Sequence, residues 1–177
     1  MRKKETPLFW ITGLSGAGKS TLAATLSVHL ASEGLKPIML DGDELRDIFQ
    51  FYGNQEEKYD RANRLELAFR YGRLAYQLIN QGFPVIVSTI SLFKEIHQWN
   101  RDNIPGYTEI YLKVSKQELR RRDPKGLYKS FDKGDIINIA GFDLDVDEPV
   151  TPDFLIDTDE YIDVNKVAKQ IIERFFV

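Results

Sequence analysis

The segment from Gly13 to Ser20, GLSGAGKS, constrains this chain more than any other feature. It matches the pattern G-x-x-x-x-G-K-[S/T], in which glycines allow successive backbone N–H groups to face phosphate oxygens. An apolar, β-prone run precedes it at 7–12, and a helix-forming run follows it at 19–34. A loop of this kind between a strand and a helix predicts that the chain binds a nucleoside triphosphate where its first strand ends.

Each residue type in this loop has a role that its chemistry fits. Lys19 is expected to reach the β- and γ-phosphates, and the Ser20 hydroxyl is expected to bind Mg²⁺. A nucleoside triphosphate and Mg²⁺ are therefore predicted, and the lack of a guanine-reading segment, for which NKVA at Asn165 is the nearest match, favours ATP over GTP. A chance match is the alternative, but it occurs only about once in 10⁴ starting points at typical composition. The other residues expected to bind the nucleotide are Gly13, Leu14, Ser15, Gly16, Ala17, Gly18 and Thr21.

Strand-like and helix-like segments alternate along the rest of the chain. This alternation predicts a parallel sheet with helices on both faces. We therefore expect an α/β, three-layer P-loop kinase fold with a five-stranded parallel sheet, built as one domain over residues 1–177. The predicted strands are 7–13, 36–43, 83–90, 107–114 and 153–157, and the predicted helices are 19–34, 64–82, 115–122 and 163–176.

Two further stretches are interpreted from local composition. A polar loop is expected at 53–57, and Ser115 with Glu118 is expected to form a capping box at the start of the helix over 115–122. Residues 123–152 are rich in Asp, Gly and Lys and show no sustained periodicity. A stretch this long within a compact domain is a functional lid or is disordered. We expect a lid.

Composition narrows the function classes. The chain has 177 residues and no cysteine, which excludes disulfides, thiolate zinc sites and cysteine nucleophiles. A net charge of −3 argues against a nucleic-acid-binding surface. No apolar run is long enough to cross a membrane, and MRKKETP lacks the apolar core of a signal peptide. We expect a cytoplasmic protein whose partner is a small molecule, with no nucleic acid and no membrane.

An acidic segment, LDGDELR, follows the second predicted strand. Asp41 and Asp43 are separated by one glycine, so in an extended segment both carboxylates point the same way. Ligands of open α/β sheets bind at the carboxyl ends of the strands, where this segment lies. One carboxylate is expected to orient or deprotonate an acceptor hydroxyl and the other to help hold Mg²⁺, with Arg46 on an anionic group. An alternative is that Asp43 only caps the next helix.

A basic cluster lies at the start of the lid. An Asp-Pro pair ends the preceding helix, so we expect Arg122 and Lys125 to turn toward whatever the lid covers. Phosphoryl transfer needs positive charge that is supplied when a lid closes. A solvated surface is the alternative, above all for Arg120 and Arg121. The five cations of RRRDPKGLYK are Arg120, Arg121, Arg122, Lys125 and Lys129.

Taken together, these segments resemble those of adenylylsulfate kinases, which phosphorylate the ribose 3′-hydroxyl of adenosine 5′-phosphosulfate with MgATP. RDPKGLYK is the most specific match. The resemblance runs across most of the chain, and the matching segments occur in the same order as in the family. The matching segments are GLSGAGKST, LDGDELR, DR at 60–61, STIS at 88–91, RDPKGLYK, and GDI…G.D…EP over 134–149.

The resemblance implies roles for particular residues. Asp41 would be the catalytic base or a carboxylate that shares Mg²⁺ with Ser20. Arg122 would sit over the transferring phosphate, and Lys125 would contact the phosphosulfate end of the acceptor. A homodimer and a place in sulfate assimilation are also implied. The implied catalytic residues are Lys19, Asp41, Arg122 and Lys125, and the implied acceptor-binding residues are Asp41, Asp43, Arg46, Arg61, Ile90, Lys125 and Ile139.

The chain departs from the family on the acceptor side. Ile139 and Ala140 stand where the family has a Phe-Thr pair whose ring stacks on the adenine. Loss of that ring forfeits about 1–3 kcal/mol of stacking. The family's ENIRR after Asp-Arg becomes ANRLELAFR here, and its SPYR becomes SLFKEIHQWNR. Phe51, Tyr52 or Phe142 could instead supply the missing ring.

These departures leave the function open among several hypotheses. The first is an adenylylsulfate kinase. The second is a relative that phosphorylates the 3′-hydroxyl of cytidine diphosphoramidate, a precursor in capsule modification, because a branch of the family with that activity is also similar to this chain. The third is an ATP-binding module without transfer activity, which the retained Asp41, Arg122 and Lys125 disfavour. RDPKGLYK disfavours a gluconate or shikimate kinase.

Overall fold

The five strands form one parallel sheet in the order β2-β3-β1-β4-β5. The structure is a computed structural model that describes residues 6–49 and 60–176, so the loop expected at 53–57 lies outside the described residues. The predicted five-stranded parallel sheet is confirmed. The strands are β1 (Leu8–Thr12), β2 (Ile38–Asp41), β3 (Val85–Thr89), β4 (Tyr107–Lys113) and β5 (Phe154–Asp157).

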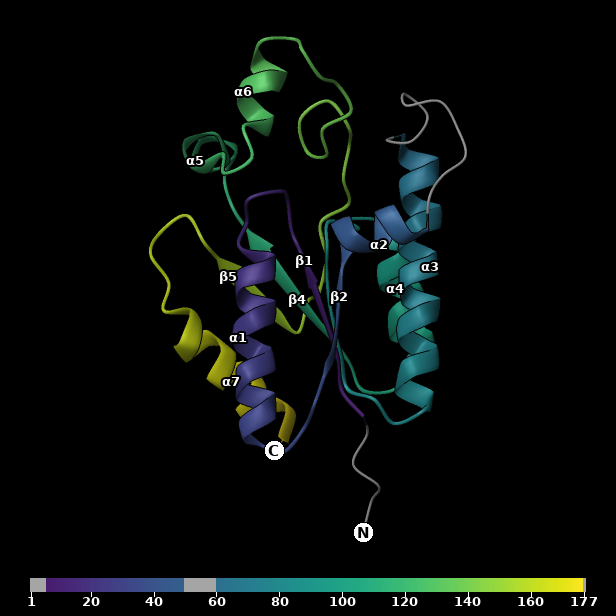
Figure 1. Ribbon diagram of the computed structural model, residues 1–177. Coiled ribbons are helices and arrows are strands. Elements are labelled where there is room, and N and C mark those ends of the chain that lie inside the picture. The colour runs from purple at the N-terminus through teal and green to yellow at the C-terminus, as the bar shows by residue number, and fades with distance from the viewer. Residues whose placement is uncertain (1–5, 50–59, 177) are drawn as a thin grey trace.

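Helices cover both faces of the sheet, as a three-layer fold requires. α1 and α7 lie on one face and α3 and α4 on the other (Figure 1). None of the helices among the described residues has the length and apolar character that a membrane span needs. The helices are α1 (Lys19–Ser32), α2 (Gly42–Ile48), α3 (Arg61–Asn80), α4 (Lys94–Asn103), α5 (Lys116–Arg122), α6 (Leu127–Asp132) and α7 (Val164–Phe176).

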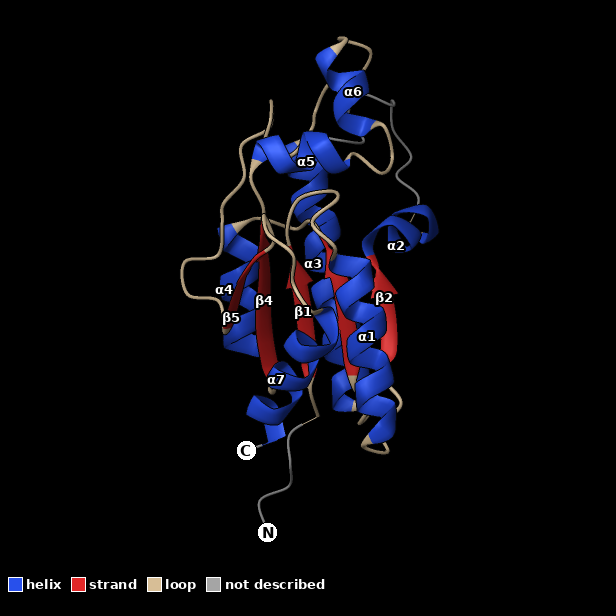
Figure 2. Ribbon diagram, turned by 90° about the vertical axis from the view of Figure 1, so that its left-hand side faces the viewer, coloured by secondary structure: helices blue, strands red, loops and turns tan. Residues whose placement is uncertain are grey.

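The central strand β1 is buried throughout, and its residues before Thr12 are all apolar, because both of its faces are covered by helices. Leu8 and Trp10 pack toward α3 and α4, whereas Phe9 and Ile11 pack toward α1 and α7. This alternation places two cores on opposite sides of the sheet. The sheet is thereby covered on both faces, and the carboxyl ends of its parallel strands point toward one edge, at the top of Figure 2.

Several predicted boundaries were wrong. α3 begins at Arg61 rather than at residue 64, because the Asp60 side chain accepts a hydrogen bond from the Asn63 backbone N–H at 2.8 Å and caps the helix. The helices α4 and α6 were not predicted. Only one of the two hydrogen bonds of the predicted capping box is present. Ser115 Oγ accepts from the Glu118 N–H, but the Ser115 N–H donates to Asp159 Oδ1.

The lid is ordered and packs onto the P-loop. α5 and α6 stand above the sheet, and the chain after α6 returns toward it (Figure 1). Leu14 of the P-loop shares a small apolar core with Tyr128, Ile139 and Ala140 of the lid. The Tyr128 hydroxyl donates to the Ser15 carbonyl at 2.6 Å. The lid and the phosphate loop are therefore joined directly.

Candidate active site

The candidate site lies at the carboxyl ends of β1, β2 and β3, below the lid. Two glycines explain why the phosphate loop has its sequence. A Cβ on Gly13 would lie 2.6 Å from the Leu112 carbonyl oxygen, so no other residue fits there. Gly18 has a φ of 97° and is the last residue before α1, a backbone conformation that favours glycine. The loop thus ends where the N–H groups of the first turn of α1 begin.

Lys19 bends back onto its own loop in the structure. Its Nζ donates to the Leu14 carbonyl at 2.8 Å. Burial lowers the pKa of Lys19 from its usual value to about 8, although Asp43 and Asp41 oppose the shift. A triphosphate would provide the negative charge that this partly buried ammonium group lacks.

ATP binding should weaken above pH 8. The proton of Lys19 is lost with a pKa of about 8, and only the charged form attracts the phosphates. If the protonated form alone binds well, the Kd for ATP rises about tenfold between pH 7 and pH 9. Calorimetric titration at both pH values, in buffers of different ionisation enthalpy, measures the affinity and the proton uptake together. A Kd that is constant over this range contradicts the shift.

Asp41 joins β2 to the phosphate loop. Its Oδ2 accepts hydrogen bonds from Ser20 Oγ at 3.1 Å and from Ser88 Oγ at 2.8 Å. Its Oδ1 accepts from the Asp43 backbone N–H at 2.9 Å, so Asp41 is the residue that caps α2. Two expectations about the backbone of the acidic segment were therefore wrong. Asp43 does not cap the helix, and the segment is helical from Gly42 onward rather than extended.

The pair formed by Ser20 and Asp41 fits Mg²⁺. The two side chains offer only oxygen atoms, which this hard cation prefers, and they converge on one side of a cavity that also contains Lys19. No group of three or more His, Asp or Glu side chains suited to a metal occurs among the described residues. Mg²⁺ binds through few protein ligands and keeps water and phosphate oxygens, so a two-residue set is sufficient.

Asp43 connects the lid to the body of the protein. Lys125 Nζ lies 2.7 Å from Asp43 Oδ2, and Arg46 Nη1 lies 3.1 Å from Asp43 Oδ1. Burial alone would raise the pKa of Asp43, but the contacts with Lys125, Arg46 and Lys19 hold it below its ordinary value. The carboxylate is therefore charged and faces the cavity. The lid lysine and the acidic segment therefore meet at this carboxylate.

Arg122 lies apart from Lys125. Its Nε donates to Glu118 Oε1 at 2.7 Å, and its Nη2 donates to the Thr158 carbonyl. It lines a separate hollow of about 360 Å³ beside Gly18 and Thr21. The expectation that Arg122 and Lys125 face one covered site is therefore wrong for this structure. Asp123, which lies between them in the chain, has a positive φ of 23°, and the two side chains line different hollows.

The other cations of the cluster have local partners. Arg120 pairs with Asp132 at 2.9 Å, and Arg121 pairs with Glu118 at 2.6 Å. These contacts agree with the alternative of a solvated surface. Lys129 is exposed on α6.

Two connected hollows lie between the phosphate loop and the lid. One, of about 290 Å³, is lined by the P-loop with Asp41, Asp43 and Lys125. The other, of about 680 Å³, extends under the lid along Arg64, Ile90 and Ile139. The residues that line both hollows are Ser15, Asp43, Arg46, Ile90 and Lys125.

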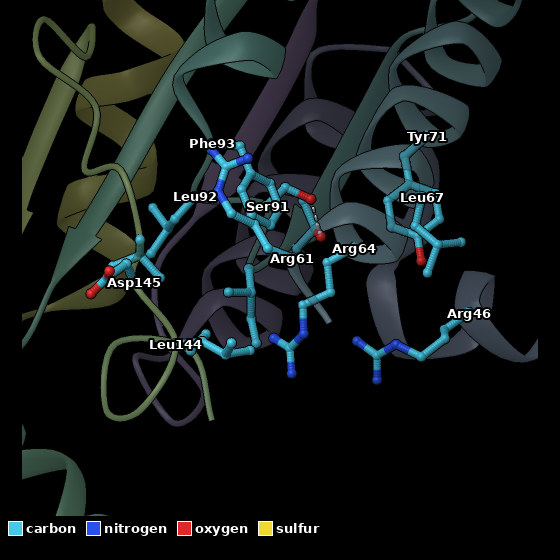
Figure 3. Close-up of a pocket in the computed structure, with 14 residues that line it drawn as sticks. Arg46, Arg61, Arg64, Leu67, Tyr71, Ser91, Leu92, Phe93, Leu144 and Asp145 are labelled. Atoms are coloured by element: carbon cyan, nitrogen blue, oxygen red, sulfur yellow. Dashed lines mark hydrogen bonds between the residues drawn. The ribbon is translucent and has the colours of Figure 1, made fainter. Parts of the chain in front are cut away.

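A third, narrower hollow continues from the second along α3 (Figure 3). Arg61 lies at this hollow, with its Nη2 at 3.0 Å from Glu95 and 3.1 Å from Asp147. The hydrogen bond to Glu95 raises the pKa of Arg61. Arg46 and Ile90 line this hollow as well. The structure thus brings Arg46, Arg61 and Ile90 to one cavity, as expected.

The ring that the sequence lacks at position 139 is not supplied by Phe142. That ring stacks on Tyr128 with centroids 4.7 Å apart, and Arg120 lies 4.9 Å from its centroid. Phe142 lines neither the hollow under the lid nor the narrow hollow along α3, whereas Ile139 lines the hollow under the lid. Phe51 and Tyr52 lie outside the described residues. Ile139 is therefore one of the apolar residues that line this part of the cavity, where Tyr128 is the aromatic one.

Sequence reasoning missed three residues of the site. Ser88 holds Asp41, Tyr128 holds Ser15, and Arg64 donates to the Asn138 carbonyl at 2.7 Å. Ser88 and Tyr128 lie inside the segments STIS and RDPKGLYK that match the family, so the match could have identified them as site residues. Arg64 lies in a segment that differs from the family, and that difference could have identified it.

Comparisons with known proteins agree with this geometry. Residues 5–157 match the family model described as adenylylsulphate kinase. The chain is 40% identical over 147 residues to a cytidine diphosphoramidate kinase of Campylobacter jejuni, covering 83% of this chain and 84% of that protein. It is 34% identical over 173 residues to a probable adenylyl-sulfate kinase of Bacillus subtilis, covering 97% and 85%.

The fold agrees as well. The structure of the Mycobacterium tuberculosis APS kinase in complex with AMPPNP and APS superposes with a TM-score of 0.84 at 29% identity, covering 98% of this chain and 99% of that chain. A shikimate kinase from Aquifex aeolicus, at 15% identity and a TM-score of 0.56, shares the fold alone. The chain belongs to the adenylylsulphate kinase family, and it is a kinase that uses ATP and transfers phosphate to a hydroxyl group.

Proposed function

We propose that this kinase transfers the γ-phosphate of MgATP to the ribose 3′-hydroxyl of a nucleotide that carries an anionic group at its 5′ end. The observation that carries the proposal is the continuous cleft from Lys19 to Ile139. The hollow at the P-loop and the hollow under the lid share walls, so a donor and an acceptor nucleotide fit end to end.

The donor side has three named contributions. Lys19 leaves the Leu14 carbonyl and binds the β- and γ-phosphates. Ser20 and Asp41 hold Mg²⁺, which neutralises charge on the phosphate oxygens when it is bound. Arg122 is proposed to contact the donor nucleotide from the hollow beside Gly18 and Thr21, rather than the transferring phosphate.

The acceptor side depends on Asp43. The carboxylate of Asp41 already accepts hydrogen bonds from Ser20, Ser88 and the Asp43 N–H, which suits a metal-side group. Asp43 lines both hollows and is about half exposed, so we propose that it touches the acceptor hydroxyl. Arg46 and Lys125 contact the same carboxylate and provide positive charge for the 5′ anion.

Cytidine diphosphoramidate is the first candidate acceptor, and adenylylsulfate is the second. The relative named for the cytidine compound is 40% identical, and Ile139 removes the aromatic wall that suits adenine. Adenylylsulfate is supported by the family and by relatives that are 34–37% identical. Measuring ADP formation from MgATP in the presence of each acceptor in turn shows which of the two is phosphorylated. If neither acceptor causes ADP to form, the ATP-binding module is favoured and the proposal is contradicted.

Ile139→Phe should improve the use of adenylylsulfate. A ring at this wall can stack on adenine, and stacking of about 1–3 kcal/mol corresponds to a rise in kcat/KM of about 5- to 150-fold before strain is subtracted. Ile139 is only 8% exposed, so strain from the larger side chain opposes part of the gain. Ile139→Leu keeps the volume without a ring and is the matched control. A kcat/KM for adenylylsulfate that is equal in the two variants contradicts the stacking argument.

The proposal includes a homodimer and a cytoplasmic location. Both rest on the family resemblance and on the need for ATP. Sedimentation of the purified protein at several concentrations tests the dimer, and a mass near 20.5 kDa at all of them contradicts it.

A further inference from the structure

Arg64 occupies an unusual position between the helices and the lid. It lies in the first turn of α3, and it lines both the hollow under the lid and the narrow hollow along α3. Its Nη2 donates to the backbone carbonyl of Asn138 at 2.7 Å. In Figure 3 the side chains of Arg64 and Arg46 extend toward the same side of the cavity. The arginine is thus held next to Ile139, the wall of the proposed base site.

The lid turn that Arg64 contacts is held by other residues as well. Asn138 has a φ of 66°, and its N–H donates to Asp143 Oδ2 at 2.7 Å. The Ile139 N–H donates to Asp143 Oδ1 at 2.5 Å. Gly141 approaches the P-loop so closely that a Cβ there would lie 2.9 Å from Leu14. Asp143 therefore fixes the turn from within, independently of Arg64.

A guanidinium group is a planar fork of five N–H donors and has no acceptor. The bond to a lid carbonyl holds one nitrogen of this fork, Nη2, at the edge of the cavity. Cytosine presents two adjacent acceptors, O2 and N3, to such a fork. Adenine presents N1 next to an N6 amino donor, and uracil presents a protonated N3 between its carbonyls. Only cytosine among the three offers the fork two neighbouring acceptors on its pairing edge.

We propose that Arg64 is a specificity-determining residue that reads the O2 and N3 edge of a cytosine base in the acceptor. This inference rests on the proposed function and deepens it, since it names the class of base. The base lies against Ile139, and Arg64 donates to its edge. Paired contacts of this kind discriminate between bases by about tenfold or more.

The test is Arg64→Asn in the full-length protein. We expect kcat/KM for cytidine diphosphoramidate to fall about tenfold or more, with kcat/KM for adenylylsulfate and the KM for ATP unchanged. Arg64→Lys keeps the charge without the fork and should lose the same selectivity. Full selectivity in Arg64→Lys overturns the inference, because charge alone would then be sufficient.

Asp143→Ala is the matched control for a purely structural role. It loosens the turn at 138–139 without removing a group from the cavity, so it should lower kcat/KM for both acceptors by the same factor. If Arg64→Asn also lowers both equally, Arg64 anchors the lid or binds the 5′ anion, and the inference is overturned.

A binding measurement separates this inference from the proposed function. With AMPPNP saturating the donor site, cytidine 5′-diphosphate should bind the wild-type protein about tenfold more tightly than uridine 5′-diphosphate, and Arg64→Asn should abolish the difference. If this result is found without any phosphate transfer, the base site stands and the proposed function fails. If transfer occurs but the two diphosphates bind equally, the inference fails and the proposed function stands.

Discussion

Lys19→Ala should lower kcat by about 10³-fold while the protein stays folded, because it removes a donor that acts on charge developing in the transition state. The ammonium group is partly buried, and its pKa is lowered to about 8 by that burial, so the folded protein bears a desolvation penalty that alanine relieves. Turnover and thermal stability should therefore change in opposite directions. Steady-state ADP release and thermal unfolding measure the two effects on the same sample.

Lys169→Ala is the matched control for this substitution. Lys169 lies on α7, two-thirds exposed, and is 3.8 Å from Glu173. Its replacement should leave kcat unchanged. A Lys19→Ala protein with more than about a tenth of the wild-type kcat contradicts the assignment of the P-loop as the donor site.

Asp41→Asn should lower kcat about 100-fold at low Mg²⁺ and shift the Mg²⁺ dependence to higher concentration. Loss of a group that orients or binds a metal typically reduces metal affinity or activity 10- to 100-fold. Asparagine keeps the size and is as good a helix cap as aspartate, so α2 should stay capped. The activity loss therefore reports the missing charge rather than a damaged helix. Activity titrated against Mg²⁺ and Mn²⁺ measures it.

Asp163→Asn makes the same chemical change at another helix start. Asp163 Oδ1 accepts from the Asn165 and Lys166 N–H groups at the start of α7, and Asp163 does not line the hollow that contains Ser20 and Asp41. It should not change the Mg²⁺ dependence. If Asp41→Asn has the Mg²⁺ dependence of the wild type, Asp41 does not lie on the metal side of the site.

Local sequence determined the parts of this site that lie close together in the chain. The P-loop follows β1 directly and the acidic segment lies at the end of β2, so the order of the elements was sufficient to bring these two segments together. The ion pair of Asp43 with Lys125, 82 residues apart, was not predicted, because Lys125 follows α5 rather than a strand end.

Other features depend on contacts that no local pattern records. The buried face of α4 includes His97 and Asn100, so it lacks the apolar periodicity that predicts a helix. Arg122 is separated from Lys125 because its guanidinium binds Glu118 and the carbonyl of Thr158, which is 36 residues further along the chain. The contact of Arg64 with Asn138 spans 74 residues and depends on how the lid returns to the sheet.

The position of the transferred phosphate tests the central claim most directly. The purified protein would be incubated with MgATP and cytidine diphosphoramidate, and separately with adenylylsulfate, and the product would be examined by phosphorus NMR. The cleft from Lys19 to Ile139 predicts a new phosphorus signal coupled to the ribose H3′, with one ADP formed per product and none from an acceptor that lacks the 3′-hydroxyl. A phosphate on any other atom, or ADP formation that persists with a 3′-deoxy acceptor, would contradict it.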